Sequence, residues 1–136
     1  MYDSSDCLTQ DMREKSSMIF YSNLYVSPKI RKPRKIKKDL IHGKGHLSIY
    51  VLLLARGPEG RPQLEIMHCA NLQSQYYRVH QAFIIGIAEG KADAIEMVNS
   101  ITMESFNMTG QWNAAEYLAS RTGFVPGDTP VPVLRS

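Results

Sequence analysis

The sequence predicts a single α+β domain in which one main C-terminal helix packs on a face of a small, mainly antiparallel sheet of three or four strands. Three observations support this fold class. The chain has 136 residues, of which 43% are hydrophobic and 21% charged, as expected for one globular domain. Two apolar runs joined by a Gly- and Pro-rich loop, within residues 47–69, indicate a β-hairpin. The helical periodicity of apolar residues in residues 91–108 indicates the main helix.

The predicted domain spans residues 18–122, and the two ends of the chain differ from it in composition. Residues 1–17 are polar and lack apolar periodicity, so we expect a disordered leader. Residues 123–136 contain three Pro and two Gly, which predicts a flexible tail. The sequence shows no basic-then-apolar export signal and no run of roughly 18 apolar residues, so we expect a cytoplasmic protein without a membrane partner.

The first predicted element covers residues 19–26, IFYSNLYV, which are rich in aromatic and β-branched side chains. Its two polar residues would lie on opposite faces, so the segment is either a short first strand or an extended lead-in. In the basic stretch that follows, a Pro suits the first helical turn, Ile36 and Leu40 share a face, and Gly43 suits the helix end. We therefore predict a short basic helix over residues 34–42.

The hairpin strands, LSIYVLLLA and LEIMHCA, come next. Alternation along the second strand places Leu64, Ile66 and His68 on one face and Glu65, Met67 and Cys69 on the other. Residues 71–81 then cross over as a loop or a short helix. Residues 82–88, AFIIGIA, are apolar and contain several β-branched side chains, which predicts a buried strand.

The C-terminal part of the domain is predicted to be helical. The main helix covers residues 91–108 and is closed by Gly110. Its apolar face is predicted to consist of Ala94, Ile95, Val98, Ile101, Thr102 and either Ser105 or Phe106. A second short helix within WNAAEYLAS is predicted to pack against the sheet or the main helix through Trp112, Ala115 and Leu118.

The predicted sheet is small enough to leave unpaired edges and an open face. Unpaired edge strands invite pairing with another chain, and exposed aromatic residues gain from burial. We therefore expect a symmetric homodimer.

Basic residues concentrate in one segment, residues 28–46. This basic segment holds eight of the sixteen lysines and arginines and a single acid, Asp39, so its local charge is +7 in a chain of net charge +3, and the rest of the chain carries −4. Clustered ammonium and guanidinium groups displace the counterions condensed on nucleic acids. The candidate contacts are Lys29, Arg31, Lys32, Arg34, Lys35, Lys37 and Lys38. Tyr76, Tyr77 and Arg78 could add stacking on bases.

Residues 86–91, GIAEGK, lie between a strand and a helix, as a phosphate-binding loop does. Their spacing does not fit such a loop, because three residues separate the glycines and Ala92 follows the lysine. Glu89 would also repel a phosphate. We interpret the segment as a Gly turn that lets the strand and the helix pack closely.

The histidines, cysteines and acids form no predicted catalytic or metal-binding set. Two glycines separate His42 from His46, and the neighbours His68 and Cys69 would point to opposite faces of a strand. Cys7 and Cys69 are predicted to be free thiols. The candidate acids are scattered over different elements, namely Glu65, Asp93, Glu96 and Glu104. We therefore expect no cofactor, no metal and no catalytic residue.

One part of the chain resembles a family of small bacterial proteins of unknown function. The resemblance rests on the hairpin, on FIIGIAEGKADAIEMVNSI, where a strand ends in a Gly-x-Ala turn before a helix rich in Ala, Glu and Val, and on NMTGQWNAAEYL, where a Thr-Gly step precedes an aromatic residue. It covers about residues 34–119. It implies a shared fold, with no assigned activity and no catalytic residues to carry over.

Together these observations predict a non-enzymatic binding module that contacts nucleic acid through the basic segment. The alternative is a protein-interaction or homodimeric self-assembly module, in which the charge serves solubility. The two differ in their dependence on conditions: nucleic-acid binding weakens steeply with salt, whereas self-assembly makes stability depend on protein concentration.

Overall fold

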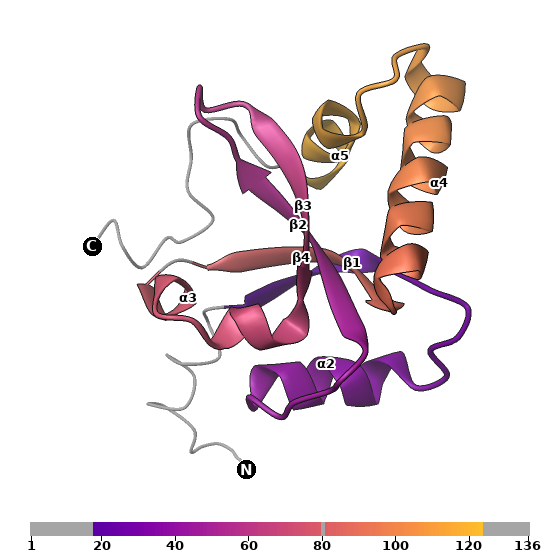
Figure 1. Cartoon of the computed structure of the whole chain (residues 1–136). Helices are drawn as coiled ribbons and strands as arrows, with labels where there is room; N and C mark the ends of the chain where they lie inside the picture. Colours follow the sequence, from indigo (N-terminus) through magenta and orange to yellow (C-terminus); the bar gives the residue numbers. More distant parts are fainter. Residues whose placement is uncertain (1–17, 80, 124–136) are drawn as a thin grey trace.

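The computed structural model describes residues 18–79 and 81–123, and it contains a four-stranded sheet with helices on both sides (Figure 1). The strands are β1 (Met18–Val26), β2 (Ile49–Arg56), β3 (Pro62–His68) and β4 (Ala82–Glu89). Their order in the sheet is β1-β4-β2-β3, with β2 antiparallel to β3 and β4, and β1 parallel to β4. The α+β class with a mainly antiparallel sheet is therefore confirmed. The predicted leader and residues 124–136 of the predicted tail lie outside the described residues.

β2 and β4 occupy the centre of the sheet and are apolar along most of their length. Val51, Ile84 and Ile87 have no exposed surface. A strand that is covered on both faces needs apolar residues at successive positions, which explains why the sequence shows runs here instead of alternation. The first segment, for which a strand and a lead-in were both open, is the edge strand β1.

The basic helix, the main helix and the last helix begin and end within one or two residues of the predicted positions, and the crossover, for which a loop and a short helix were both open, contains a short helix. The helices are α2 (Pro33–Ile41), α3 (Tyr76–Val79), α4 (Lys91–Thr109) and α5 (Ala114–Thr122), with a 3₁₀ turn, η1 (Cys69–Gln73), before α3. Gly110 closes α4 in the left-handed conformation, at φ 79°. The Asn113 side chain caps α5 by accepting a hydrogen bond from the Glu116 N–H at 3.1 Å. Among the described helices, none is both long enough and apolar enough to cross a membrane.

Both faces of the sheet are covered (Figure 1). On one face α4 and α5 pack against the sheet through side chains that include the fully buried Ile101 and Leu118. On the other face α2 and η1 contribute the buried Leu40 and Leu72. The prediction of an open face is therefore wrong. The reason is that the basic helix is amphipathic, so its apolar stripe covers the sheet that a single helix would have left exposed.

The buried side of α4 differs from the predicted one. Ile95 is 46% exposed, whereas Met97, which was not predicted to be buried, lies in the core. Gly86 of β4 explains the difference, because a Cβ at Gly86 would overlap the Met97 sulfur. The missing side chain leaves the space that Met97 fills. The buried residues of α4 are consequently Ala94, Met97, Ile101 and Ser105.

Trp112 contacts the main helix, as one of the two predicted alternatives has it, but it is neither buried nor part of α5. It precedes α5, is 55% exposed, and stacks on Phe106 of α4 with ring centroids 4.1 Å apart. Ala115 and Leu118, which were predicted to lie on the same packing face as Trp112, are buried as expected. The helix begins only at Ala114, so Trp112 does not share the buried face of α5.

Candidate nucleic-acid interface

The basic segment forms α2 and the turns that flank it. Ile36 and Leu40 turn the apolar side of α2 toward the sheet, which leaves the basic side facing solvent. The exposed cations of the predicted set are Lys29, Arg31, Lys32, Arg34, Lys35 and Lys38. Lys37 is half-buried, with its ammonium 5.2 Å from the centre of the Phe20 ring on β1.

The cations of the basic segment differ in their partners. Lys29 lies 3.9 Å from the carboxylate of Asp93, and Lys35 lies 3.1 Å from that of Asp39. Within residues 18–79 and 81–123, no ion pair engages four exposed cations: Arg31, Lys32, Arg34 and Lys38. Among the predicted contacts on described residues, these four are therefore the exposed cations whose charge no carboxylate compensates.

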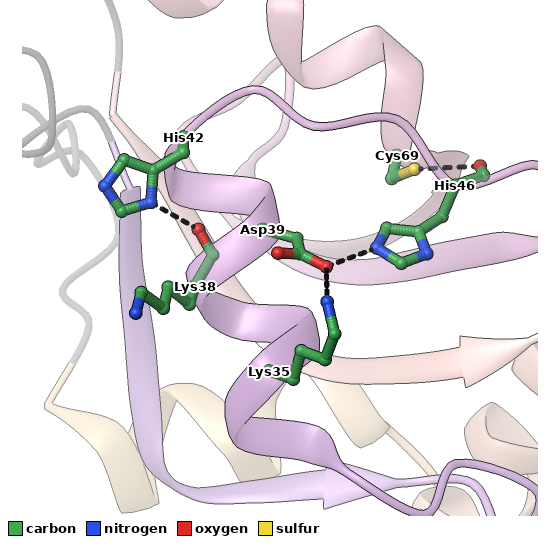
Figure 2. A network of polar contacts seen from close by, with 6 residues as sticks. All are labelled: Lys35, Lys38, Asp39, His42, His46 and Cys69. Carbon is green, nitrogen blue, oxygen red and sulfur yellow. Dashed lines mark hydrogen bonds and ion pairs between the residues drawn. The ribbon is translucent and has the colours of Figure 1, made fainter.

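Asp39, the single acid of the basic segment, points inward and is buried. Its Oδ2 accepts hydrogen bonds from Lys35 Nζ at 3.1 Å and from His46 Nε2 at 2.8 Å, and both side chains converge on the carboxylate in Figure 2. A carboxylate only accepts, so His46 Nε2 carries the proton. The Lys44 N–H also donates to the Asp39 carbonyl at 2.8 Å. Among the described lysines and arginines of the basic segment, Asp39 thus pairs with Lys35 alone, and it ties the loop after α2 back onto the helix.

The hydrogen bonds from His46 and then Lys35 hold the pKa of Asp39 below its usual value. We expect Asp39→Asn to lower the free energy of unfolding at neutral pH. We also expect the variant to lose less of this free energy than the wild type when the pH falls into the acid range. A carboxyl group whose pKa is depressed on folding contributes stability above the unfolded-state value of 3.8, and this contribution is lost as pH falls through the folded-state value. Thermal unfolding of wild type and variant from neutral pH down to about pH 2 checks this.

Asp93→Asn is the matched control, because its carboxylate faces the exposed Lys29 at 3.9 Å and should matter less. An Asp39→Asn protein whose melting curve follows the wild type at every pH would show that the Asp39 contacts contribute nothing to stability.

Three histidines and Cys69 make contacts near the ends of α2 and β3. His42 Nδ1 donates to the Lys38 carbonyl at 2.8 Å, on the side of α2 away from His46 in Figure 2. His68 donates from Nε2 to the Leu47 carbonyl at 2.8 Å and accepts at Nδ1 from the Ala70 N–H at 3.0 Å, which defines a neutral ring. The described residues contain no group of three or more side chains arranged to hold a metal ion.

Cys69 is a buried free thiol, as predicted, and Cys7 lies outside the described residues. Its predicted place on the second hairpin strand is wrong by one residue, because β3 ends at His68 and Cys69 begins η1. The thiol donates to the His46 carbonyl at 3.4 Å. This contact links the loop after α2 to η1.

Glu104 is not an isolated acid, contrary to the sequence-based expectation. It accepts hydrogen bonds from Tyr25 of β1, at 3.1 Å, and from Tyr117 of α5. Burial and then the nearby Glu104 raise the pKa of Tyr25, so its hydroxyl stays protonated and donates. Arg121 donates to the Tyr117 hydroxyl at 3.0 Å. The cluster joins α4, α5 and the edge strand, which is a structural role.

The close packing predicted for residues 86–91 is confirmed, but the predicted turn at Gly86 and Ala88 is wrong, because residues 86–89 belong to β4 and only Gly90 lies between β4 and α4. Gly86 lies inside β4, where a Cβ would overlap the Met97 sulfur and would approach the Tyr25 carbonyl oxygen to 3.2 Å. Gly90 precedes α4 with φ 93° and donates its N–H to the Ser48 carbonyl at 2.6 Å. Gly86 therefore serves close packing, whereas a Cβ at Gly90 would meet nothing within 4 Å and Gly90 serves the positive φ of the turn into α4.

Tyr76 and Tyr77 lie on α3, on the same face of the sheet as α2 (Figure 1). Their rings are perpendicular, with centroids 4.8 Å apart, and Tyr76 is 56% exposed. Burial and then the charge of Glu65 raise the pKa of Tyr77 to about 12. Arg78 belongs to the same turn of helix. Contact between these residues and bases stays a prediction.

A cleft of about 250 Å³ adjoins these tyrosines. Its lining comes from β2, β3, α3 and the start of β4, with Arg56, Glu65 and Gln81 as polar residues beside Tyr76 and Tyr77. No local pattern in the sequence indicates this cleft, because its residues come from four separate segments.

Comparisons with protein-family models, with curated proteins and with solved structures give no match for this chain. The resemblance to small bacterial proteins therefore stays a prediction.

Proposed function

We propose that the protein is a non-enzymatic module that binds nucleic acid through α2 and the turn before it. The observation that carries this proposal is a set of exposed cations without an ion-pair partner among the described residues: Arg31 and Lys32 in the turn before α2, and Arg34 and Lys38 on α2, which Leu40 anchors to the core. Because Leu40 holds α2 against the sheet, the helix can present its charges to a phosphate backbone while it stays folded. Contacts of this kind release counterions and carry little sequence information. We expect the protein to act in the cytoplasm.

Fluorescence anisotropy with random-sequence duplex DNA, single-stranded DNA and RNA tests the proposal. We expect micromolar binding at low salt, with log affinity falling against log salt at a slope of about −3 to −4 on duplex DNA if the four cations each meet a phosphate. A comparison of the three probes shows which nucleic acid binds best. Absence of binding at the lowest salt would exclude this function.

A second candidate is self-assembly, and the exposed apolar surface formed by α4 and the turn after it favours it. Met103, Phe106 and Trp112 are all more than a third exposed, although their side chains are large and apolar. A second copy of the chain could bury this surface. Trp112 is the single tryptophan of the chain, so its emission reports directly on this surface. A blue shift with rising protein concentration, absent in Phe106→Ser, would support a dimer, and a concentration-independent mass and spectrum would exclude it.

A further inference from the structure

Leu47 has the most exposed large apolar side chain among the described residues. It is 98% exposed, whereas Met108, the next in this order, is 65% exposed. Leu47 lies in the apolar run from which the first hairpin strand was predicted, but β2 begins only at Ile49. The side chain therefore stands in the loop between α2 and β2 and belongs to neither side of the core.

Hydrogen bonds to other parts of the chain hold the backbone around Leu47 in place. The His68 ring donates from Nε2 to the Leu47 carbonyl at 2.8 Å. The preceding carbonyl, that of His46, accepts from the Cys69 thiol at 3.4 Å. The carbonyl of the residue after Leu47 accepts from the Gly90 N–H at 2.6 Å. Because three consecutive carbonyls are fixed, the Leu47 side chain is held outward, and little further ordering is needed when a partner covers it.

The loop that carries Leu47 doubles back along α2. The ring of His46, the residue before Leu47, donates to the Asp39 carboxylate, on which Lys35 also converges (Figure 2). Lys38 lies three residues after Lys35 on α2, so the two lysines are neighbours on the helix surface. The exposed apolar side chain of Leu47 thus stands beside the cations of the proposed interface.

A partner that covers both Leu47 and the cations must offer apolar surface close to negative charge. Stacked base pairs between phosphate backbones have this arrangement. Proteins that bend DNA insert leucine and similar side chains between neighbouring base pairs, while their cationic side chains contact the DNA around the inserted residue. Glu89, which accepts a hydrogen bond from the hydroxyl of Ser48, next to Leu47, would repel a phosphate but not the uncharged face of a base.

An anionic lipid surface offers the same two features but fits the structure less well. Helices that lie in a membrane surface bury a whole apolar face. The apolar side of α2, with Ile36 and Leu40, already faces the sheet. Within residues 28–48, Leu47 is the only exposed large apolar side chain. One leucine is a small anchor for a bilayer, whereas a step between base pairs accommodates one inserted side chain.

We propose that Leu47 inserts between neighbouring base pairs of duplex DNA while the cations of α2 and of the turn before it hold the flanking phosphates. This inference rests on the proposed nucleic-acid function and identifies the partner as a duplex that opens readily at one step. Pyrimidine–purine steps and mismatches have this property, because unstacking them costs less than unstacking other paired steps.

Fluorescence anisotropy of the full chain with two short duplexes tests the inference. One duplex is fully paired, and the other has the same length and carries a single C·A mismatch. We expect the wild type to bind the mismatched duplex roughly tenfold more tightly, because less of the binding free energy is lost to unstacking. A fluorescent adenine analogue beside the mismatch should brighten on binding as it unstacks, which a purely electrostatic contact would not cause.

Three variants assign the effect to Leu47. Leu47→Ser should bind the two duplexes within about twofold of each other and keep the wild-type salt slope, because it removes no phosphate contact. Leu47→Met should keep the preference for the mismatch, since methionine also serves as a wedge. Met108→Ser removes an exposed apolar side chain from α4 and should bind as the wild type does. Leu47 is outside the core, so Tm should not change in Leu47→Ser.

The outcomes separate this inference from the function on which it rests. Absence of binding to every nucleic-acid probe at low salt would exclude the function and the inference together. Binding to single strands but to neither duplex, equal binding of the two duplexes by the wild type, or a mismatch preference that persists in Leu47→Ser would overturn the inference alone. Vesicles of phosphatidylserine and phosphatidylcholine are the last comparison. Loss of vesicle binding in Leu47→Ser with unchanged DNA binding would make a membrane the partner of Leu47 and overturn the inference.

Discussion

Replacing Arg31, Lys32, Arg34 and Lys38 together by glutamine is expected to weaken nucleic-acid binding by roughly 100-fold or more near physiological salt. Each lost phosphate contact lowers the salt slope by about one, so the slope should fall by 3 to 4. The variant keeps Lys35 and Lys37, because the first contacts Asp39 and the second lies over Phe20. Exposed substitutions of this kind usually change stability by less than about 0.5 kcal/mol each, so Tm should change little. Anisotropy across a salt series and thermal unfolding measure the two effects.

A pair of double variants separates the position of the charge from its amount. Arg34→Gln with Lys38→Gln and Arg61→Gln with Lys91→Gln both lower the net charge from +3 to +1. The first pair lies on α2, whereas Arg61 begins the return from the hairpin turn and Lys91 opens α4. We expect the first pair to reduce the salt slope and the second to leave it nearly unchanged. Equal losses in both would assign the binding to net charge alone and contradict the α2 interface.

Gly86→Val is expected to destabilise the protein by about 3 kcal/mol, which corresponds to roughly 10 °C in Tm for a domain of this size. A side chain at Gly86 would overlap the Met97 sulfur on one side and approach the Tyr25 carbonyl on another. Met97 is packed in the core and the Tyr25 carbonyl belongs to the backbone of β1, so α4 or β1 must shift away from β4. Urea unfolding monitored by circular dichroism gives the change in free energy of unfolding.

A double-mutant cycle shows whether Met97 causes this cost. Gly86→Ala should destabilise the wild type more than it destabilises Met97→Ala, in which the space that Met97 fills is free for the new methyl group. Additive effects of the two substitutions would show that the contact with Met97 is not the cause and would leave the backbone at Tyr25 as the source of strain.

The secondary structure of this chain is largely readable from its sequence. The hairpin follows from two apolar runs around a Gly- and Pro-rich loop, and α4 follows from its periodicity and from Gly110 at its end. These signals are local, since they depend on neighbouring residues and on the backbone conformations that glycine and proline allow. The position of α2 and its basic character are local in the same way.

Packing was predicted less well, because it depends on what lies opposite each residue. Met97 is buried in place of Ile95 since Gly86, on a different element, leaves a space for it. α2 and η1 cover the face of the sheet that we predicted to be open. The order of the helices along the chain does not show which face of the sheet each helix covers. Trp112 is exposed because α5 begins after it.

The sequence by itself determined the fold class, the main elements and the location of the positive charge, because each of these follows from composition or from short-range periodicity. The tertiary structure alone decided which charges remain uncompensated, by turning Asp39 inward to Lys35 and His46. It also decided the cleft, by separating β2 from β4 beyond Leu53. Both outcomes depend on contacts between residues distant along the chain, and such contacts form only when the packed sheet and helices fix their relative positions.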